Sequence, residues 1–235
     1  MKSFIVEKDF WELFPQARFG IIIFQGVDNR IQNEDKYDKM LLNAEKNALA
    51  YITDDEFINN DVIKVWREAF KKFKTKKGAR CSIEALLKRV HKGNHIGTIN
   101  PLVDMYNSIS LKYALPCGGE DIDTFVGDMR LTKAIGNEDF VTLGSDKSEP
   151  PYEEEIVYKD DVGAVCRCWN WRESVRTMLT EDTKNVFLII ESVDENRNED
   201  LENAVKELAA LVKENIGGTY KTAIVDINNA KIPII

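Results

Sequence analysis

Residues 99–123 read INPLVDMYNSISLKYALPCGGEDID, and this segment carries the most specific pattern in the chain. Its second half places Gly118 and Gly119 directly before Glu120 and Asp121. Glycines let a backbone approach a ligand closely or adopt a positive φ angle. We therefore expect a ligand-facing loop whose carboxylates bind an ammonium group or position a water. The alternative is a tight turn in which the acids cap the helix that follows.

A second unusual cluster, residues 166–174, reads CRCWNWRES. Aromatic rings can stack on nucleic-acid bases, and arginines can pair with phosphates. If an alternating strand runs through this cluster, Trp169 and Trp171 share one face and Asn170 lies on the other. We predict that Trp169, Asn170 and Arg172 contact a ligand. The alternative is a buried aromatic strand with a salt bridge.

The mixture of strand-like and helical patterns predicts an α+β fold with mixed sheets and packed helices. Apolar runs at 19–24 and 186–190 fit buried strands, and residues 139–143 form another strand-like piece. Residues 62–73 and 199–215 carry apolar side chains at helical spacing. We expect one domain over 1–235, with N-terminal strands and a helix (1–60), a core (60–195) and a C-terminal helix and strand (196–235).

The composition, 43% hydrophobic and 31% charged, is that of a folded protein and excludes wholesale disorder. The N-terminal apolar stretch is too short for a signal peptide, so we expect a cytoplasmic protein with reduced cysteines and no membrane contact. Cys166 and Cys168 could start a metal site, but His91 and His95 are distant in sequence and no second cysteine pair follows. We predict no metal and no cofactor.

Positive charge is concentrated in residues 64–92. This span holds eleven basic and two acidic residues, and so carries +9 in a chain whose net charge is −8. A basic stripe on an acidic protein is typical of contact with a phosphate backbone. The predicted backbone contacts are Lys71, Lys72, Lys74, Lys76, Lys77 and Arg80. The alternative is a solvated helix face followed by a lysine-rich loop.

Residues 99–123 resemble the tRNA-binding and editing domain, called B3/B4, of the bacterial phenylalanyl-tRNA synthetase beta chain. That family shows an Ile-Asn-x-x-Val-Asp-x-x-Asn segment, followed by Gly-x-Pro and a loop ending in Asp. Further residues match in the same order: Arg130, Gly136, Phe140, Thr142, Leu143, Thr180, Thr183, Asn185 and Val186. The resemblance covers roughly residues 60–195. The chain is too short for a synthetase core, so it resembles a free-standing member and not a full phenylalanine–tRNA ligase.

The resemblance implies a mixed α/β structure with a central cleft between two sub-parts. In the synthetase this cleft accepts the end of a mischarged tRNA, typically tyrosyl-tRNA(Phe), and hydrolyses the ester. The synthetase loop has a His two residues after its Pro, where this chain has Gly118. Residues 169–172 replace the Gly-rich stretch before the family's acidic residue, for which Glu173 is the candidate counterpart. These departures leave the amino-acid specificity open.

The resemblance implies a catalytic site that needs no covalent intermediate. We predict that Gly118 and Gly119 donate backbone N–H groups to an oxyanion, and that Glu120 or Glu173 orients water or binds the amino group. The predicted substrate contacts are Asn107, Ser108, Ser110, Pro116, Cys117, Asp121, Trp169, Asn170 and Arg172. Asn107, Ser108 and Ser110 could instead stabilise a turn by buried hydrogen bonding. Cys117 as a nucleophile would lack an adjacent His to activate it.

Three functional hypotheses follow. The first is a tRNA-binding protein that deacylates mischarged tRNA in trans through its aminoacylated 3′ end. The second is a non-catalytic binder of tRNA or of a free amino acid. The third is an enzyme acting on a small ester or amide without tRNA. Salt-sensitive tRNA binding separates the third from the others, and loss of hydrolysis with retained binding in Glu120→Gln or Glu173→Gln separates the first from the second.

Overall fold

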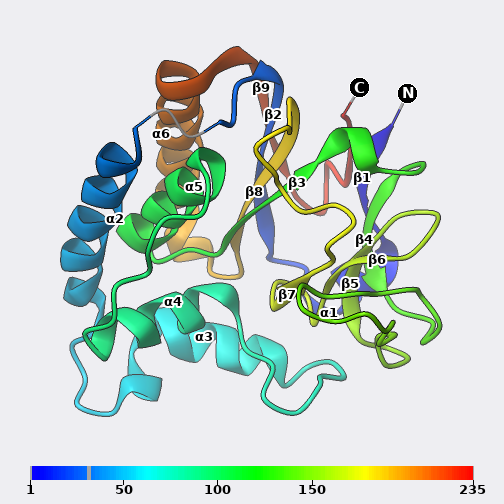
Figure 1. The fold of residues 1–235 in the computed structure, drawn as a ribbon. Helices are drawn as coiled ribbons and strands as arrows, with labels where there is room; N and C mark the ends of the chain where they lie inside the picture. Colours follow the sequence, from blue (N-terminus) through cyan, green and yellow to red (C-terminus); the bar gives the residue numbers. More distant parts are fainter. Residues whose placement is uncertain (1, 31–32, 235) are drawn as a thin grey trace.

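The computed structural model describes residues 2–30 and 33–234, which form two sheets and six α-helices (Figure 1). The strands are β1 (Ser3–Val6), β2 (Arg18–Val27), β3 (Cys117–Asp121), β4 (Met129–Lys133), β5 (Ile156–Lys159), β6 (Ala164–Arg167), β7 (Arg172–Glu173), β8 (Asn185–Ser192), β9 (Gly217–Val225) and β10 (Lys231–Pro233). The helices are α1 (Lys8–Leu13), α2 (Glu34–Ala48), α3 (Asp61–Phe70), α4 (Ser82–His91), α5 (Pro101–Tyr113) and α6 (Asn198–Ile216). The predicted α+β class is confirmed.

The four-stranded sheet has the order β3-β8-β2-β9 and is antiparallel throughout. Its central strands are the two apolar runs of the sequence, with Ile21 opposite Ile189. Alternate residues enter different cores, because successive side chains of a strand point to opposite faces. Ile21 and Ile189 join one apolar cluster, whereas Ile22 and Leu188 join the other. The run of apolar residues is continuous because both faces of this sheet are buried.

Helices α5 and α6 pack on one face of this sheet, and α2 packs outside α5 (Figure 1). Gly20 on β2 makes the approach of α6 possible, since a Cβ atom there would lie 2.2 Å from Cγ2 of Val205. Helix α5 begins after Asn100, whose side-chain oxygen accepts a hydrogen bond of 3.1 Å from the Val103 N–H. Asn100 also donates to the Leu179 carbonyl, so this cap lies beside the segment that precedes β8.

The six-stranded sheet has the order β10-β1-β4-β5-β6-β7, in which only β1 and β4 run parallel. An aromatic core lies between this sheet, β2, α1 and α3, and includes Phe4, Phe10, Phe19, Trp66 and Trp169. Among the residues placed in the structure, no helix is long and apolar enough to cross a bilayer. The domain boundaries at 60 and 195 stay a prediction, although β2, β8 and β9 bring all three parts into one sheet.

Two expectations about local structure are wrong. The apolar stripe over 62–73 is helical only as far as Phe70, and Phe73 lies in the loop beyond. Residues 139–143 form no strand apart from one bridge between Asp139 and Gly163. The Glu138 carboxylate accepts hydrogen bonds from the N–H groups of residues 135 and 136 at 2.9 and 3.0 Å. Beyond that turn the Phe140 N–H donates to the Ser148 hydroxyl at 3.0 Å, so a side chain takes the place of a strand partner.

Candidate functional site

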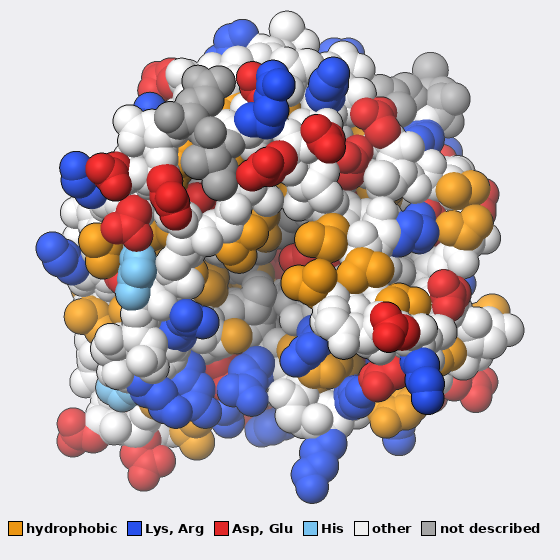
Figure 2. All heavy atoms as spheres, viewed as in Figure 1, with side chains coloured by type: hydrophobic (Ala, Val, Ile, Leu, Met, Phe, Trp, Pro, Cys, Tyr) orange, Lys and Arg blue, Asp and Glu red, His pale blue; other side chains and the backbone are white. Residues whose placement is uncertain are grey.

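A cavity of about 560 Å³ lies between the two sheets and helices α4 and α5. Its walls come from β3 and β8 of one sheet, from β5, β6 and β7 of the other, and from both helices. The space-filling view shows one face hollowed near its centre, with Lys and Arg side chains gathered below the hollow and hydrophobic side chains beside it (Figure 2). The apolar part of the lining includes Leu86, Ile96, Ile99, Met129, Leu143, Phe187 and Ile189.

Glu120 on β3 is a buried carboxylic acid in this lining. Its side chain is 8% exposed, and its Oε2 atom has no hydrogen-bond partner in the described structure. Burial raises the pKa of Glu120 well above its usual range, and the neighbouring carboxyl of Glu173 raises it further. An unpartnered buried acid is costly unless a ligand or a proton satisfies it.

Glu173 enters the cavity from β7, a two-residue strand whose register places it opposite Cys166 of β6. Its side chain is reached by solvent, yet it lies among the cavity walls. The surrounding cavity walls remove part of the hydration of the carboxyl, and this desolvation raises the pKa of Glu173 to about 7. A carboxyl that titrates near neutral pH can accept and return a proton during turnover.

Glu191 on β8 is a third carboxyl in the lining, and the sequence analysis missed it. It is 2% exposed and accepts hydrogen bonds from the Tyr158 hydroxyl, the Trp169 indole N–H and the Asn170 amide. Burial raises the pKa of Glu191 to about 7, while its three donors act in the opposite direction. The available signal was an acid closing an otherwise apolar strand run.

Trp169 does not offer a stacking face, contrary to the prediction. Its indole is fully buried, at ring-centroid distances of 4.9 Å from Phe10 and 4.7 Å from Phe14. Strand β6 ends at Arg167, and Cys168 and Trp169 adopt left-handed φ angles of 45° and 64°. The expected alternation through this segment therefore fails, and the turn directs Trp169 into the aromatic core.

Trp171 and Arg172 lie at the cavity instead, together with Asn170. The guanidinium carbon of Arg172 is 5.1 Å from the Trp171 ring centroid. Asn170 donates to Glu191, but its amide oxygen is buried without a partner. The hydroxyl of Ser82 on the opposite wall is likewise unpartnered. The cavity lining therefore holds three buried polar atoms without a hydrogen-bond partner, namely Ser82 Oγ, Glu120 Oε2 and Asn170 Oδ1, which are free to bind a ligand.

Asn107, Ser108 and Ser110 are predicted substrate contacts that all lie on α5, and of these three only Asn107 lines the cavity. Ser108 donates to the Met105 carbonyl at 2.7 Å, and Ser110 donates to the Leu115 carbonyl at 2.6 Å. Both hydroxyls are buried inside the helix packing. Ser108 and Ser110 therefore form the buried hydrogen bonds of the alternative interpretation.

Two further predicted contacts lie outside the cavity lining. The Pro116 carbonyl accepts the Glu191 N–H at 3.0 Å, which ties the start of β3 to β8. The Asp121 carboxylate accepts from the Thr183 hydroxyl at 2.7 Å and from the Asp123 N–H at 2.9 Å. Asp121 thus caps the short 3-10 helix Ile122–Thr124, as the turn-and-cap alternative predicts.

Gly118 and Gly119 belong to strand β3 and not to a loop, so the expected loop is wrong. A Cβ atom on Gly118 would lie 3.7 Å from Ile189, an ordinary contact at the cavity wall. A Cβ atom on Gly119 would lie 2.7 Å from Leu188 and 2.9 Å from Leu179. Close packing in the core, and not a positive φ angle, is what requires glycine at 119.

The cysteines beside the cavity are poor nucleophiles. Burial raises the pKa of the Cys117 thiol well above its usual range, and Glu191 raises it further. Burial also raises the pKa of Cys166. A thiol that stays protonated at neutral pH does not attack an ester. Within residues 2–30 and 33–234, no group of three or more His, Cys, Asp or Glu side chains could hold a metal ion.

A second, more basic depression adjoins the cavity mouth. We call it the basic groove, and its lining is Gly78, Arg80, Ala85, Lys88, Arg89, Lys92, Asn94, Trp171 and Arg172. Arg89, Trp171 and Arg172 also line the cavity, so the two hollows share a wall. The groove is positive, whereas the cavity contains three carboxyl groups.

Of the six predicted backbone contacts, only Arg80 lies in the basic groove. Lys71 pairs with Glu68 at 2.6 Å, and Lys76 pairs with Glu149 at 2.5 Å. The amines of Lys72 and Lys74 lie over the rings of Phe14 and Tyr152, and Lys77 is exposed outside the groove. The groove brings Arg80 together with Lys88, Arg89 and Lys92, which belong to the same basic span of the sequence. Contact of these side chains with a phosphate backbone stays a prediction.

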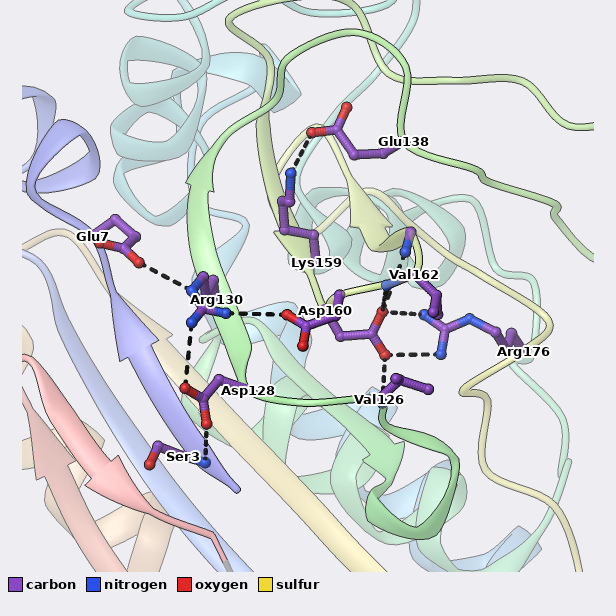
Figure 3. A network of polar contacts seen from close by, with 12 residues as sticks. Ser3, Glu7, Val126, Asp128, Arg130, Glu138, Lys159, Asp160, Val162 and Arg176 are labelled. Atoms are coloured by element: carbon purple, nitrogen blue, oxygen red, sulfur yellow. Dashed lines mark hydrogen bonds and ion pairs between the residues drawn. The ribbon is translucent and has the colours of Figure 1, made fainter. Parts of the chain in front are cut away.

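A polar network fixes the segment that follows β7. The Asp160 carboxylate accepts two hydrogen bonds from Arg176, of 2.8 and 2.9 Å, and further ones from the N–H groups of Val126 and Val162 (Figure 3). Arg130 binds Glu7 at 3.2 Å in the same region (Figure 3). These contacts hold Arg176, whose charge lowers the pKa of Glu120, against Asp160.

Comparison with known proteins identifies the family of this chain. The chain is 33% identical over 104 residues to the phenylalanine–tRNA ligase beta subunit of Mycoplasmoides gallisepticum, a match covering 44% of this chain and 13% of that protein. The crystal structure of an N-terminal fragment of the phenylalanyl-tRNA synthetase beta subunit from Pyrococcus horikoshii shares the fold, with a TM-score of 0.50, 11% identity, and coverage of 94% of this chain and 53% of that one. A profile of the B3/4 domain matches residues 65–217. The protein therefore belongs to the B3/4 domain family.

Proposed function

We propose that this protein binds tRNA and hydrolyses the ester of mischarged aminoacyl-tRNA in trans. The observation that carries the proposal is the shared wall between the basic groove and the cavity, formed by Arg89, Trp171 and Arg172. A strand of RNA needs cations for its phosphates, and its aminoacylated end needs an enclosed, partly apolar cavity. The similarity to a synthetase beta subunit supports tRNA as the nucleic acid.

The basic groove suits the phosphates near the 3′ end. Lys88 in the last turn of α4 and Lys92 at its C-cap are four residues apart and both line the groove. Trp171 at the junction of groove and cavity, backed by Arg172, provides an aromatic face on which a terminal base can stack. In this role Trp171 replaces the buried Trp169.

Glu173 is suited to act as the general base. Its carboxylate takes a proton from water as the water oxygen attacks the ester carbonyl, and a tetrahedral oxyanion forms. The carbon–oxygen bond to the ribose then breaks, and the leaving hydroxyl takes the proton back from Glu173. Its pKa of about 7 matches this exchange at neutral pH.

Backbone donors on β3 can stabilise the oxyanion. The Glu191 N–H bonds to the Pro116 carbonyl, whereas the Asp121 N–H points to the other side and bonds to the Thr177 carbonyl at 2.9 Å. Because strand N–H groups alternate, the Gly118 N–H faces β8 and the Gly119 N–H faces away from it. Of the two predicted donors, only the Gly119 N–H lies outside the ladder with β8, on the side where Glu120 forms a bridge with Met178.

A non-catalytic binder is the second candidate, and Gly118 is the observation that favours it. This position carries no side chain at the cavity wall, where the related synthetase loop has His. If the ligand is tRNA, whether or not it is hydrolysed, we expect the protein to be cytoplasmic, and this location stays a prediction.

Substitution of Glu173 by Gln separates the two candidates. If the protein is a deacylase, Glu173→Gln lowers hydrolysis by about 100-fold or more and leaves tRNA binding within about twofold. Glu214→Gln on the exposed side of α6 is the matched control and should change neither quantity. Equal hydrolysis by wild type and Glu173→Gln would remove Glu173 from the mechanism.

A further inference from the structure

Glu120 and Glu173 form the acidic wall of the cavity, and no Lys or Arg among the described residues forms an ion pair with either of them. In the described parts of the chain, Oε2 of Glu120 is buried without a hydrogen-bond partner. The hydroxyl of Thr177, which is also buried and unpartnered, is the one neutral group that lowers the pKa of Glu120. Glu191 differs, because three donors already satisfy it. Glu120 and Glu173 are therefore the two carboxyl groups of the cavity that are available to bind a positively charged group of a ligand.

Nearby basic groups are engaged elsewhere. Both ends of the Arg176 guanidinium bind Asp160, and its Nη1 also donates to the Thr124 carbonyl. Arg89 donates from Nε to the His95 carbonyl at 2.9 Å. Arg172 lies over Trp171 at the mouth. A cation on the ligand is therefore suited to pair with Glu120 and Glu173.

We propose that Glu120, together with Glu173, binds a primary ammonium group of the ligand, so that the site accepts free amines and rejects N-acylated ones. A carboxylate and an ammonium form a short, charge-assisted hydrogen bond, which is strong where water is excluded. An N-acyl group removes the positive charge and adds bulk. The proposal rests on the proposed function in one respect, since it identifies this amine with the α-amino group of an aminoacyl ester.

Amine binding should release a proton. Without ligand, burial and the neighbouring Glu173 carboxyl favour the protonated form of Glu120. The other groups that face Glu120 are Tyr106 from α5, Asp121 from β3, Cys166 from β6 and Arg176 beyond β7. Burial keeps the pKa of Tyr106 and Cys166 above their usual ranges, so both stay neutral near pH 7. An ammonium group that binds there favours the ionised form of Glu120, and the proton of this carboxyl is released to the solvent.

The test is isothermal titration calorimetry of the full chain at pH 7. The probes are phenylalaninamide, tyrosinamide and lysinamide, whose amide bonds resist hydrolysis, and the N-acetyl derivative of each. At least one free amide should bind, and its acetylation should weaken binding by about tenfold or more. Titration in two buffers of different ionisation enthalpy should show proton release.

Variants place the interaction on Glu120. Glu120→Gln should weaken amide binding by about tenfold or more, and the shorter acid in Glu120→Asp should recover part of it. Circular dichroism verifies that each variant is folded, and Glu214→Gln is the control. Equal binding of acetylated and free amides, unchanged binding by folded Glu120→Gln, or no saturable binding of any amide would overturn the proposal.

The outcome is independent of hydrolysis. Amide binding that depends on Glu120, in a protein that releases no amino acid from tRNA, would keep the ammonium site and exclude the deacylase. Release of amino acid from N-acetylated and free aminoacyl-tRNA at equal rates would keep the deacylase and exclude the ammonium site.

Discussion

The indole N–H of Trp169 donates a hydrogen bond of 2.9 Å to Oε1 of Glu191. This bond joins the aromatic core, where Trp169 packs against Phe10 and Phe14, to the wall of the cavity. The position of the acid and the integrity of the core therefore depend on each other.

Trp169→Phe should destabilise the fold. The substitution removes a donor from a buried carboxyl, at a cost of about 1–3 kcal/mol in the free energy of unfolding. Urea denaturation monitored by circular dichroism measures the loss. Trp171→Phe at the cavity mouth is the matched control and should cost less than about 1 kcal/mol. Similar losses in the two variants would contradict the inward placement of Trp169.

The acidic cavity should make stability depend on pH. Glu173 and Glu191 have pKa values of about 7 in the folded protein, above the value of about 4.3 for an unfolded glutamate. Between these values the folded state holds more protons than the unfolded state. Their contribution to stability is therefore full below about pH 4 and is lost as the pH rises through 7.

Comparison of variants isolates this effect from other titrating groups. The free energy of unfolding of Glu173→Gln relative to wild type should become more favourable between pH 5 and pH 8, since the variant lacks one ionising group. Glu214→Gln should keep the wild-type slope. The assignment fails if Glu173→Gln and wild type have parallel pH profiles.

The two adjacent glycines of β3 should respond differently to alanine. Gly118→Ala places a Cβ atom 3.7 Å from Ile189, and we expect a change below about 0.5 kcal/mol in unfolding free energy. Gly119→Ala forces contacts of 2.7 and 2.9 Å with Leu188 and Leu179, and should cost about 1–3 kcal/mol. Thermal denaturation of both variants measures the difference. Equal stability would show that β3 shifts to make room.

The basic groove should carry the salt dependence of tRNA binding. Lys88→Ala combined with Lys92→Ala should weaken binding and reduce the slope of log K against log salt concentration by about 1 to 2. Lys71→Ala is the matched control, because its amine already pairs with Glu68. Filter binding at several salt concentrations measures the slopes. A larger effect from Lys71→Ala would move the tRNA path to the lysine-rich loop.

The sequence predicts the main elements well where apolar periodicity is strong. The buried strands β2 and β8 and the long helix α6 follow directly from their patterns. Segment 139–143 forms no strand because its backbone groups pair outside a sheet ladder: the Phe140 N–H donates to the Ser148 hydroxyl, and the Thr142 carbonyl accepts the Ser145 N–H in a turn.

The candidate site is predicted in part. Residues 107, 117–120, 170, 172 and 173 come together in one cavity, as the clustering of their motifs suggests. Glu191 could not be assigned, because its role depends on donors 21 to 33 residues away. The ion pair of Lys76 with Glu149, 73 residues later, could not be read from a local charge run either. Periodicity records local structure, whereas these contacts depend on how the sheets meet.

The most direct test of the proposed function is deacylation of a panel of aminoacyl-tRNAs, cognate and mischarged, by the purified protein. The account predicts selective release of one amino acid, or one chemical class of amino acids, with loss of release in Glu173→Gln. No release across the panel, alongside measurable and salt-sensitive tRNA binding, would contradict the hydrolase and leave a binding module.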